Sequence, residues 1–173
     1  MESPIKENRS RRVAYLGLMI SLAMIFSYVE SLISLPIPIP GIKIGLANLV
    51  VLYVLEEIGT KEAFTVSVLR ILLLAFLFTN TAALLYSLAG GIVSFFIMAI
   101  LKNSKSASVY FTSIMGAVFH NLAQLLVAGA VLHSMAVIGY LPALLISGMI
   151  TGAFISVVFV RIRKYLGVLK KTL

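Results

Sequence analysis

The chain has 173 residues, of which 61% are hydrophobic and 12% charged, and its formal net charge is +8. Soluble domains carry about 25% charged and about 45–50% apolar residues, so this composition excludes an ordinary soluble fold. The absence of cysteine excludes disulfides and thiolate metal ligands. The composition therefore predicts a single-domain, all-α polytopic membrane protein.

Apolar stretches long enough to cross a bilayer recur along the chain. A hydrocarbon core of about 30 Å requires about 20 apolar residues in helical form. Pro36, Pro38 and Pro40 end the first stretch, and the weakest break lies near Asn80. The first stretch is longer than the apolar part of a signal peptide, so we expect a retained helix. The sequence predicts six spans in one bundle, at residues 13–34, 43–57, 62–79, 82–101, 108–132 and 137–160.

The basic residues predict the orientation of these spans. With the tail 1–12 in the cytoplasm, every Lys and Arg except Lys43 and Arg70 falls in a cytoplasmic segment, including the tail 161–173. This asymmetry follows the positive-inside rule. We therefore expect a multi-pass protein of the cell membrane, inner or plasma, with both termini cytoplasmic. The bilayer explains the positive charge, and no nucleic-acid partner is needed.

Arg70 is a charged residue that falls deep inside a predicted span. It lies about 12 Å from the inner end of the third span, at about 1.5 Å per residue. A charge at this depth costs at least about 2.5–3.5 kcal/mol on insertion scales, so it requires a partner. The sequence offers Glu30, a carbonyl at a helix C-terminus, or a bound anion.

Other polar residues fall at similar depths. His120 and Gln124 are four residues apart and share a helix face with Asn121 nearby. We predict that they form a polar cavity with Arg70, open to the outside, that binds a carboxylate or phosphate. The alternative is a set of hydrogen bonds between helices. The further candidates are Asn48, Ser87 and Ser94, for which packing or capping is the alternative, and Lys43, which lies either among headgroups or at the cavity mouth.

Small residues recur at helical spacing in several spans. Gly148 and Gly152 in the sixth span are four residues apart, as are Gly17 and Ser21 in the first. Small residues allow close approach of helices, so internal packing is one explanation. The other is that Ala14, Gly17 and Ser21 dock the first span onto a partner subunit.

Four motifs carry a resemblance to a known family. They are GIKIGLANLVVLYVLEEIGTKEAFTVSVLRILLLAFLF, SLAGGIVSFFIMAILK, GAVFHNLAQLLVA and LPALLISGMITG. Together they resemble the Gx transporter family, also labelled heptaprenyl diphosphate synthase component I. That family is similar to the substrate-binding S components of energy-coupling-factor transporters. The resemblance implies a six-helix protein with a long first outer loop, whose first helix docks on a transmembrane coupling subunit.

The synthase label suggests a second function. Prenyl chain elongation requires aspartate-rich motifs that hold magnesium, and the six acidic residues here are all glutamates. The chain also lacks the G-x-x-x-x-G-K-[ST] loop of nucleotide hydrolases. We therefore expect a non-enzymatic subunit without cofactor or metal that captures a small anionic or amphipathic nutrient for a separate ATPase. The alternative is a non-catalytic membrane accessory subunit of isoprenoid synthesis.

Overall fold

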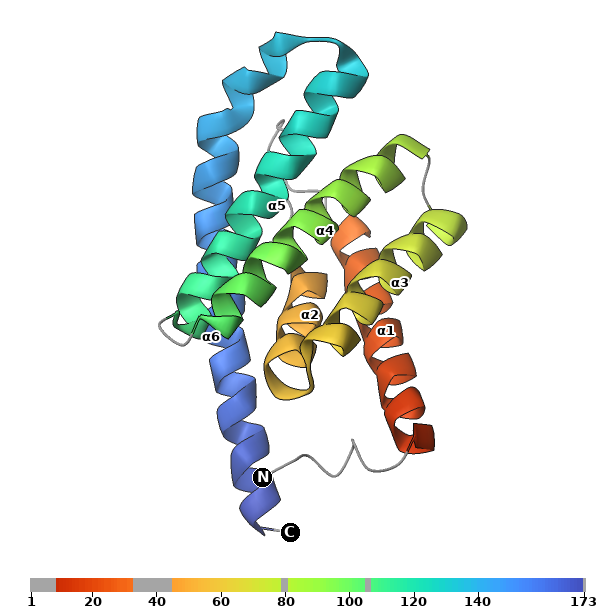
Figure 1. Cartoon of the computed structure of the whole chain (residues 1–173), viewed down its shortest axis with the longest axis vertical. Coiled ribbons are helices and arrows are strands. Elements are labelled where there is room, and N and C mark those ends of the chain that lie inside the picture. The colour runs from red at the N-terminus through yellow and green to blue at the C-terminus, as the bar shows by residue number, and fades with distance from the viewer. Residues whose placement is uncertain (1–8, 33–44, 79–80, 105–106, 173) are drawn as a thin grey trace.

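The computed structural model describes residues 9–32, 45–78, 81–104 and 107–172 (Figure 1). These residues form helices and no strand, which confirms the predicted all-α class. The elements are α1 (Arg9–Leu32), α2 (Leu46–Glu57), α3 (Thr60–Phe78), α4 (Thr81–Asn103), α5 (Val109–Leu132), the 3-10 helix η1 (Met135–Tyr140) and α6 (Leu141–Thr172).

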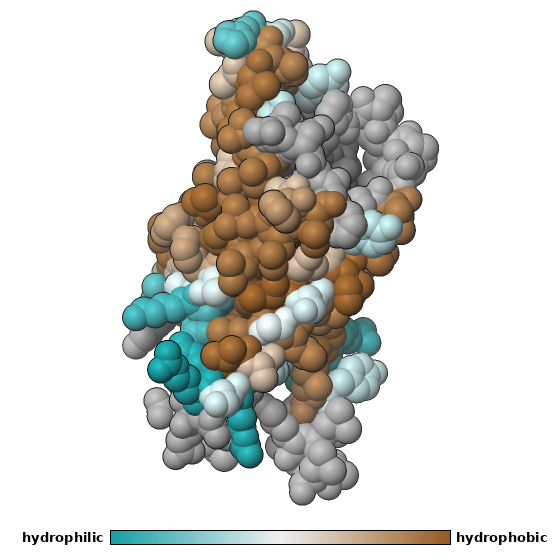
Figure 2. All heavy atoms as spheres, turned by 90° about the vertical axis from the view of Figure 1, so that its right-hand side faces the viewer, coloured by the Kyte–Doolittle hydropathy of each residue, from teal (hydrophilic) through white to brown (hydrophobic). Residues whose placement is uncertain are grey.

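Four segments of the described residues are long and apolar enough to cross a membrane. They are Arg9–Glu30, Leu84–Asn103, Val109–Leu132 and Met135–Leu166. The face shown in Figure 2 is mostly apolar, and most of its hydrophilic side chains gather toward the lower end. Exposed large side chains such as Phe76, Leu126 and Ile150 suit lipid and not water. The chain is therefore an integral membrane protein.

Two helices do not meet that span criterion. Helix α2 has 12 residues, which is about 18 Å at 1.5 Å per residue. Helix α3 has 19 residues and includes Lys61, Glu62 and Arg70. The prediction of six spans thus corresponds to six α-helices, of which four are independently apolar enough to cross.

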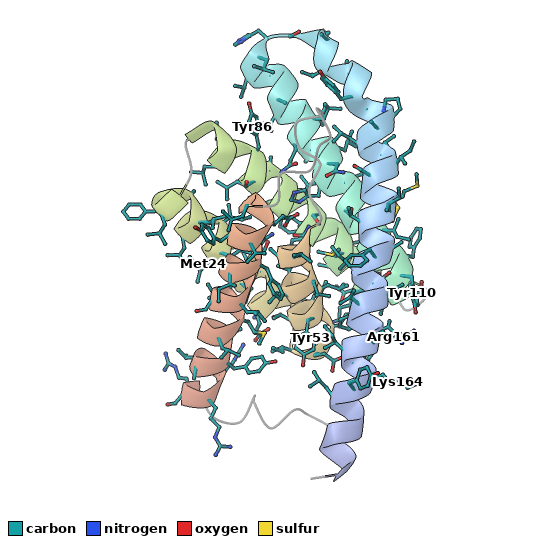
Figure 3. All side chains as sticks on the ribbon, turned by 180° about the vertical axis from the view of Figure 1, so that it is seen from behind. Met24, Tyr53, Tyr86, Tyr110, Arg161 and Lys164 are labelled. Carbon is teal, nitrogen blue, oxygen red and sulfur yellow. The ribbon has the colours of Figure 1, made fainter. Side chains whose placement is uncertain are left out.

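The short helix α2 contributes most to the core. Its residues Val51, Leu52, Val54 and Leu55 are almost fully buried, and they belong to one cluster with Phe159 of α6. The helix packs against α1, α3 and α6. Tyr53 on α2, which is labelled in Figure 3, meets Phe159 edge to face, with ring centroids 6.2 Å apart. A fully surrounded helix is expected to be apolar on every side, and α2 fits this pattern.

Several helix boundaries differ from the predicted spans, and two of these differences have a local explanation. The second span was expected from residue 43, but α2 begins at Leu46 because Gly45 is its N-cap with φ of 77°. Glycine adopts this left-handed conformation without a steric cost. The sixth span was expected to end at residue 160, but α6 continues to Thr172. No proline or glycine pair interrupts residues 161–172, so nothing local stops the helix there.

Charged side chains connect helices at the end of the bundle where α1 begins and α6 ends (Figure 1). Arg12 of α1 pairs with Glu62 of α3. Arg163 Nε of α6 lies 2.8 Å from Glu57 Oε1 of α2, a charge contact without hydrogen-bond geometry. Lys102 donates to the backbone oxygen of Leu55 near the C-terminus of α2, where the helix dipole favours a cation.

Candidate ligand-binding cavity

A cavity of about 160 Å³ lies among all six α-helices, toward the end of the bundle opposite to these ion pairs. It lies beyond the N-terminus of α2, because this helix is too short to fill the bundle along its full length. Its polar lining residues are Ser27, Glu30, Asn48, Arg70, Ser87, His120, Asn121, Gln124 and Thr151. Apolar residues such as Ile71, Leu74 and Ile155 form the rest of the wall.

Arg70 on α3 is the buried cation of this cavity. Its side chain is 8% exposed. It donates to Asn48 Oδ1 on α2 at 2.9 Å and to Ser27 Oγ on α1 at 3.3 Å. Its Nε is buried and has no hydrogen-bond partner among the described residues. The guanidinium is therefore oriented by two neutral acceptors and retains a donor for another group.

Glu30 near the end of α1 also lines the cavity. Its Oε1 accepts a hydrogen bond from the backbone N–H of Gly45, at the positively polarised N-terminus of α2. It interacts electrostatically with Arg70. Among the described residues, however, the ion pairs within 4.0 Å are Arg12–Glu62 and Arg163–Glu57. Of the three partners considered for Arg70, Glu30 is thus nearby, but it does not form a direct ion pair.

Helices α4 and α5 bring His120 and Gln124 to the cavity through a close contact at Gly90. A Cβ atom at Gly90 would lie 2.9 Å from Gln124 Cγ and from His120 Cε1 and Nε2. Both side chains therefore lie directly over the surface of α4 at this level. Ser87, almost one turn away on α4, lines the same cavity.

Asn121 lines the cavity but already has partners on α6. Its Nδ2 donates to the backbone oxygen of Leu144 at 2.9 Å and to Ser147 Oγ at 3.2 Å. Its position on the wall thus combines exposure to the cavity with hydrogen bonds between helices. The hydrogen bonds between helices that were the alternative explanation are therefore present at this residue.

Two of the remaining predicted residues are not on the described cavity wall, and two residues that were not predicted are on it. Ser94 is buried beside Gly116 in the contact between α4 and α5, and it is not part of the cavity wall. Lys43 and the rest of the first outer loop, residues 35–43, lie outside the described residues. The sequence did not single out Ser27 and Thr151, because lone hydroxyl residues on apolar helices usually satisfy their own backbone.

The small residues of α1 and α6 have different surroundings. Ala14, Gly17 and Ser21 are exposed on α1, and no atom lies within 4 Å of a Cβ placed on Gly17. Gly148 and Gly152 pack against α5, where a Cβ on Gly152 would lie 2.6 Å from Ile114 Cα. Internal packing is confirmed for the α6 pair, whereas the α1 residues are not used inside the bundle.

The side chains of this wall can form hydrogen bonds and ion pairs with a small polar ligand. The described residues hold no group of three or more His, Asp or Glu side chains that could bind a metal. The wall offers one guanidinium, one carboxylate, an imidazole, amides and hydroxyls, which are donors and acceptors for a small polar ligand.

A family model described as heptaprenyl diphosphate synthase component I matches residues 19–162. The chain belongs to the heptaprenyl diphosphate synthase component I family. No curated protein and no solved structure matches the chain. The matched region of this family member extends from the middle of α1 to Ile162 on α6, so it includes every residue that lines the cavity.

Proposed function

We propose that this protein is the substrate-binding membrane subunit of an energy-coupling-factor type importer, with six spans and both termini in the cytoplasm. It captures a small nutrient with an anionic group from outside the cell. The observation that carries this proposal is Arg70, a buried guanidinium that faces a cavity and donates to neutral partners. Guanidinium groups bind carboxylates and phosphates through paired hydrogen bonds.

The position of the cavity suits uptake from outside. Its lining residues come from the end of the bundle opposite to Arg12, Lys102 and Arg163. The positive-inside rule assigns the basic end to the cytoplasm, so the cavity belongs to the outer half of the membrane.

Replacing Arg70 tests the role of the guanidinium. In the Arg70→Ala variant, ligands found by thermal shift with a metabolite panel should bind about ten- to a hundredfold more weakly. This estimate follows from about 1.5–3 kcal/mol for a hydrogen bond to a charged group. Lys164→Ala removes an exposed cation of α6 and should leave binding unchanged. Unchanged binding in Arg70→Ala would remove Arg70 from the site.

The partners of the proposed importer are a transmembrane coupling subunit and separate ATPase subunits. We assign docking to the exposed α1 face of Ala14, Gly17 and Ser21, since small residues allow close helix contact in lipid. Gly17→Leu should abolish co-purification with the coupling subunit and preserve ligand binding. Gly139→Leu is the matched control, because a Cβ at either glycine has no atom within 4 Å.

The family description favours a second candidate function, that of a non-catalytic accessory subunit of heptaprenyl diphosphate synthesis. An affinity pull-down from membranes separates the two. The importer predicts recovery of an ATPase with a coupling subunit, and the accessory role predicts recovery of a soluble prenyltransferase. Recovery of the prenyltransferase without any ATPase would overturn the importer proposal.

A further inference from the structure

The cavity wall carries two full charges of opposite sign among its described residues. Arg70 comes from α3 and Glu30 from α1, and His120 is the other titratable residue of the wall. Glu30 and Ser27, which accepts from Arg70, are three residues apart on α1 and therefore share a face. The cation and the carboxylate thus face the same space from neighbouring helices.

These two charges do not neutralise each other through direct contact. Arg70 donates to Asn48 and Ser27, and Glu30 accepts from the backbone of Gly45. The ion pairs found within 4.0 Å in the described part of the chain involve neither of them. Each charge is held in place by neutral groups, and Arg70 Nε is buried with no partner among the described residues.

We infer that the ligand is a zwitterion, with an anionic group at Arg70 and an ammonium group at Glu30. This inference rests on the proposed binding function and specifies the substrate class. A simple anion beside Arg70 would leave the charge of Glu30 uncompensated in a region of low dielectric, where unpaired charges are costly. A ligand with both charges would compensate the charge of Arg70 and that of Glu30 together. Ile71, Leu74 and Ile155 provide an apolar wall for the carbon chain between its charged groups.

Matched probes test this assignment on the purified full chain. One series consists of unbranched ω-amino carboxylates from glycine to 6-aminohexanoate. The other consists of the unsubstituted carboxylates of equal length. Saturation-transfer NMR detects millimolar binding of either series. We expect at least one amino carboxylate to bind tenfold or more tightly than the carboxylate of its length.

The Glu30→Gln variant removes the charge and retains an oxygen that can accept from Gly45 N–H. It should abolish the preference for the amino series, whereas Glu30→Asp, which retains the charge, should preserve a preference. The thermal unfolding temperatures of both variants establish that they fold. If Glu30→Gln does not fold, a wild-type protein that binds both series equally overturns the inference.

The outcomes separate this inference from the proposed function. Carboxylate binding that is lost in Arg70→Ala but shows no preference for an ammonium group overturns the zwitterion and leaves the capture role intact. A preference that survives in Glu30→Gln also overturns it. If neither series binds, the assignment of simple zwitterions to this cavity is overturned. The metabolite panel with Arg70→Ala then tests the capture role separately.

Discussion

The environment of Arg70 decides whether the cavity can hold an anion. Its acceptors, Asn48 and Ser27, are neutral, so the positive charge is oriented without being cancelled. A carboxylate at the same distance would satisfy the guanidinium with a resident anion. The hydroxyl and amide partners therefore leave the positive charge of Arg70 available to an anion in the cavity.

The Asn48→Asp variant tests this difference directly. It places a carboxylate where an amide oxygen now lies 2.9 Å from Arg70, so we expect the thermal unfolding temperature to rise and ligand affinity to fall at least tenfold. Asn48→Ala is the control, and it should lower stability by about 1–2 kcal/mol because a bond of the guanidinium is lost. Unfolding in detergent and binding of panel ligands measure both effects. Retained affinity in Asn48→Asp would contradict the role given to neutral partners.

Counting residues along each span predicted much of the cavity wall. Depth put Arg70 and His120 at similar levels, helical spacing put Gln124 on the face of His120, and the structure places all three on the wall. Ser94 shows the limit of this reasoning. It lies seven residues beyond Ser87 on α4, deeper in the bundle, where Gly116 lets α5 approach and leaves no open space. The distance between two helices at a given depth depends on the residues of both helices. The sequence of one span alone therefore does not predict it.

At the scale of elements, close contact between α5 and α6 holds one wall of the cavity. Ser113 Oγ on α5 donates to the backbone oxygen of Gly152 on α6 at 2.8 Å. Gly152 has backbone neighbours on α5, so an added methyl group cannot be accommodated by a side-chain rotation. The spacing of Gly148 and Gly152 predicted this contact, but its partner helix could not be deduced from one sequence.

Gly152→Ala should therefore destabilise the protein by about 1–3 kcal/mol. Gly17→Ala is the same substitution on α1, where a Cβ has no atom within 4 Å, and it should leave stability nearly unchanged. Thermal unfolding of both variants in the same detergent gives the comparison. Equal unfolding temperatures of the two variants would show that α5 and α6 can move apart enough to accommodate a methyl group at Gly152 without loss of stability.

At the scale of the whole molecule, the number of crossings depends on α2 and α3. The apolar pattern predicted α1, α4 and α5 closely, because each contains a window that is long and apolar enough to cross a membrane. Helix α2 is short for a crossing and α3 carries charges, so hydropathy alone does not establish their topology. The position of the connection between them, near Lys61, distinguishes a true pair of crossings from a pair that returns to the outer surface.

The natural absence of cysteine makes this topology directly measurable. Single cysteines at the exposed residues Lys61, Ser104 and Met135 report on three connections. Six crossings predict that an impermeant maleimide labels Met135→Cys on intact cells, and labels Lys61→Cys and Ser104→Cys only after permeabilisation. Labelling of Lys61→Cys on intact cells would reduce the crossings to four.

Helix α6 is one continuous rod, of 32 residues, or about 48 Å at 1.5 Å per residue. Thr151 and Ile155 on it touch the cavity, and Arg163 farther along contacts α2, while Arg161 and Lys164 project from its lower part (Figure 3). The helix has no break between the cavity and its basic lower part. If a bound ligand displaced the part of α6 that lines the cavity, the basic lower part of the same helix would move with it. Helix α6 is therefore the element that can transmit ligand binding from the cavity to the opposite end of the bundle.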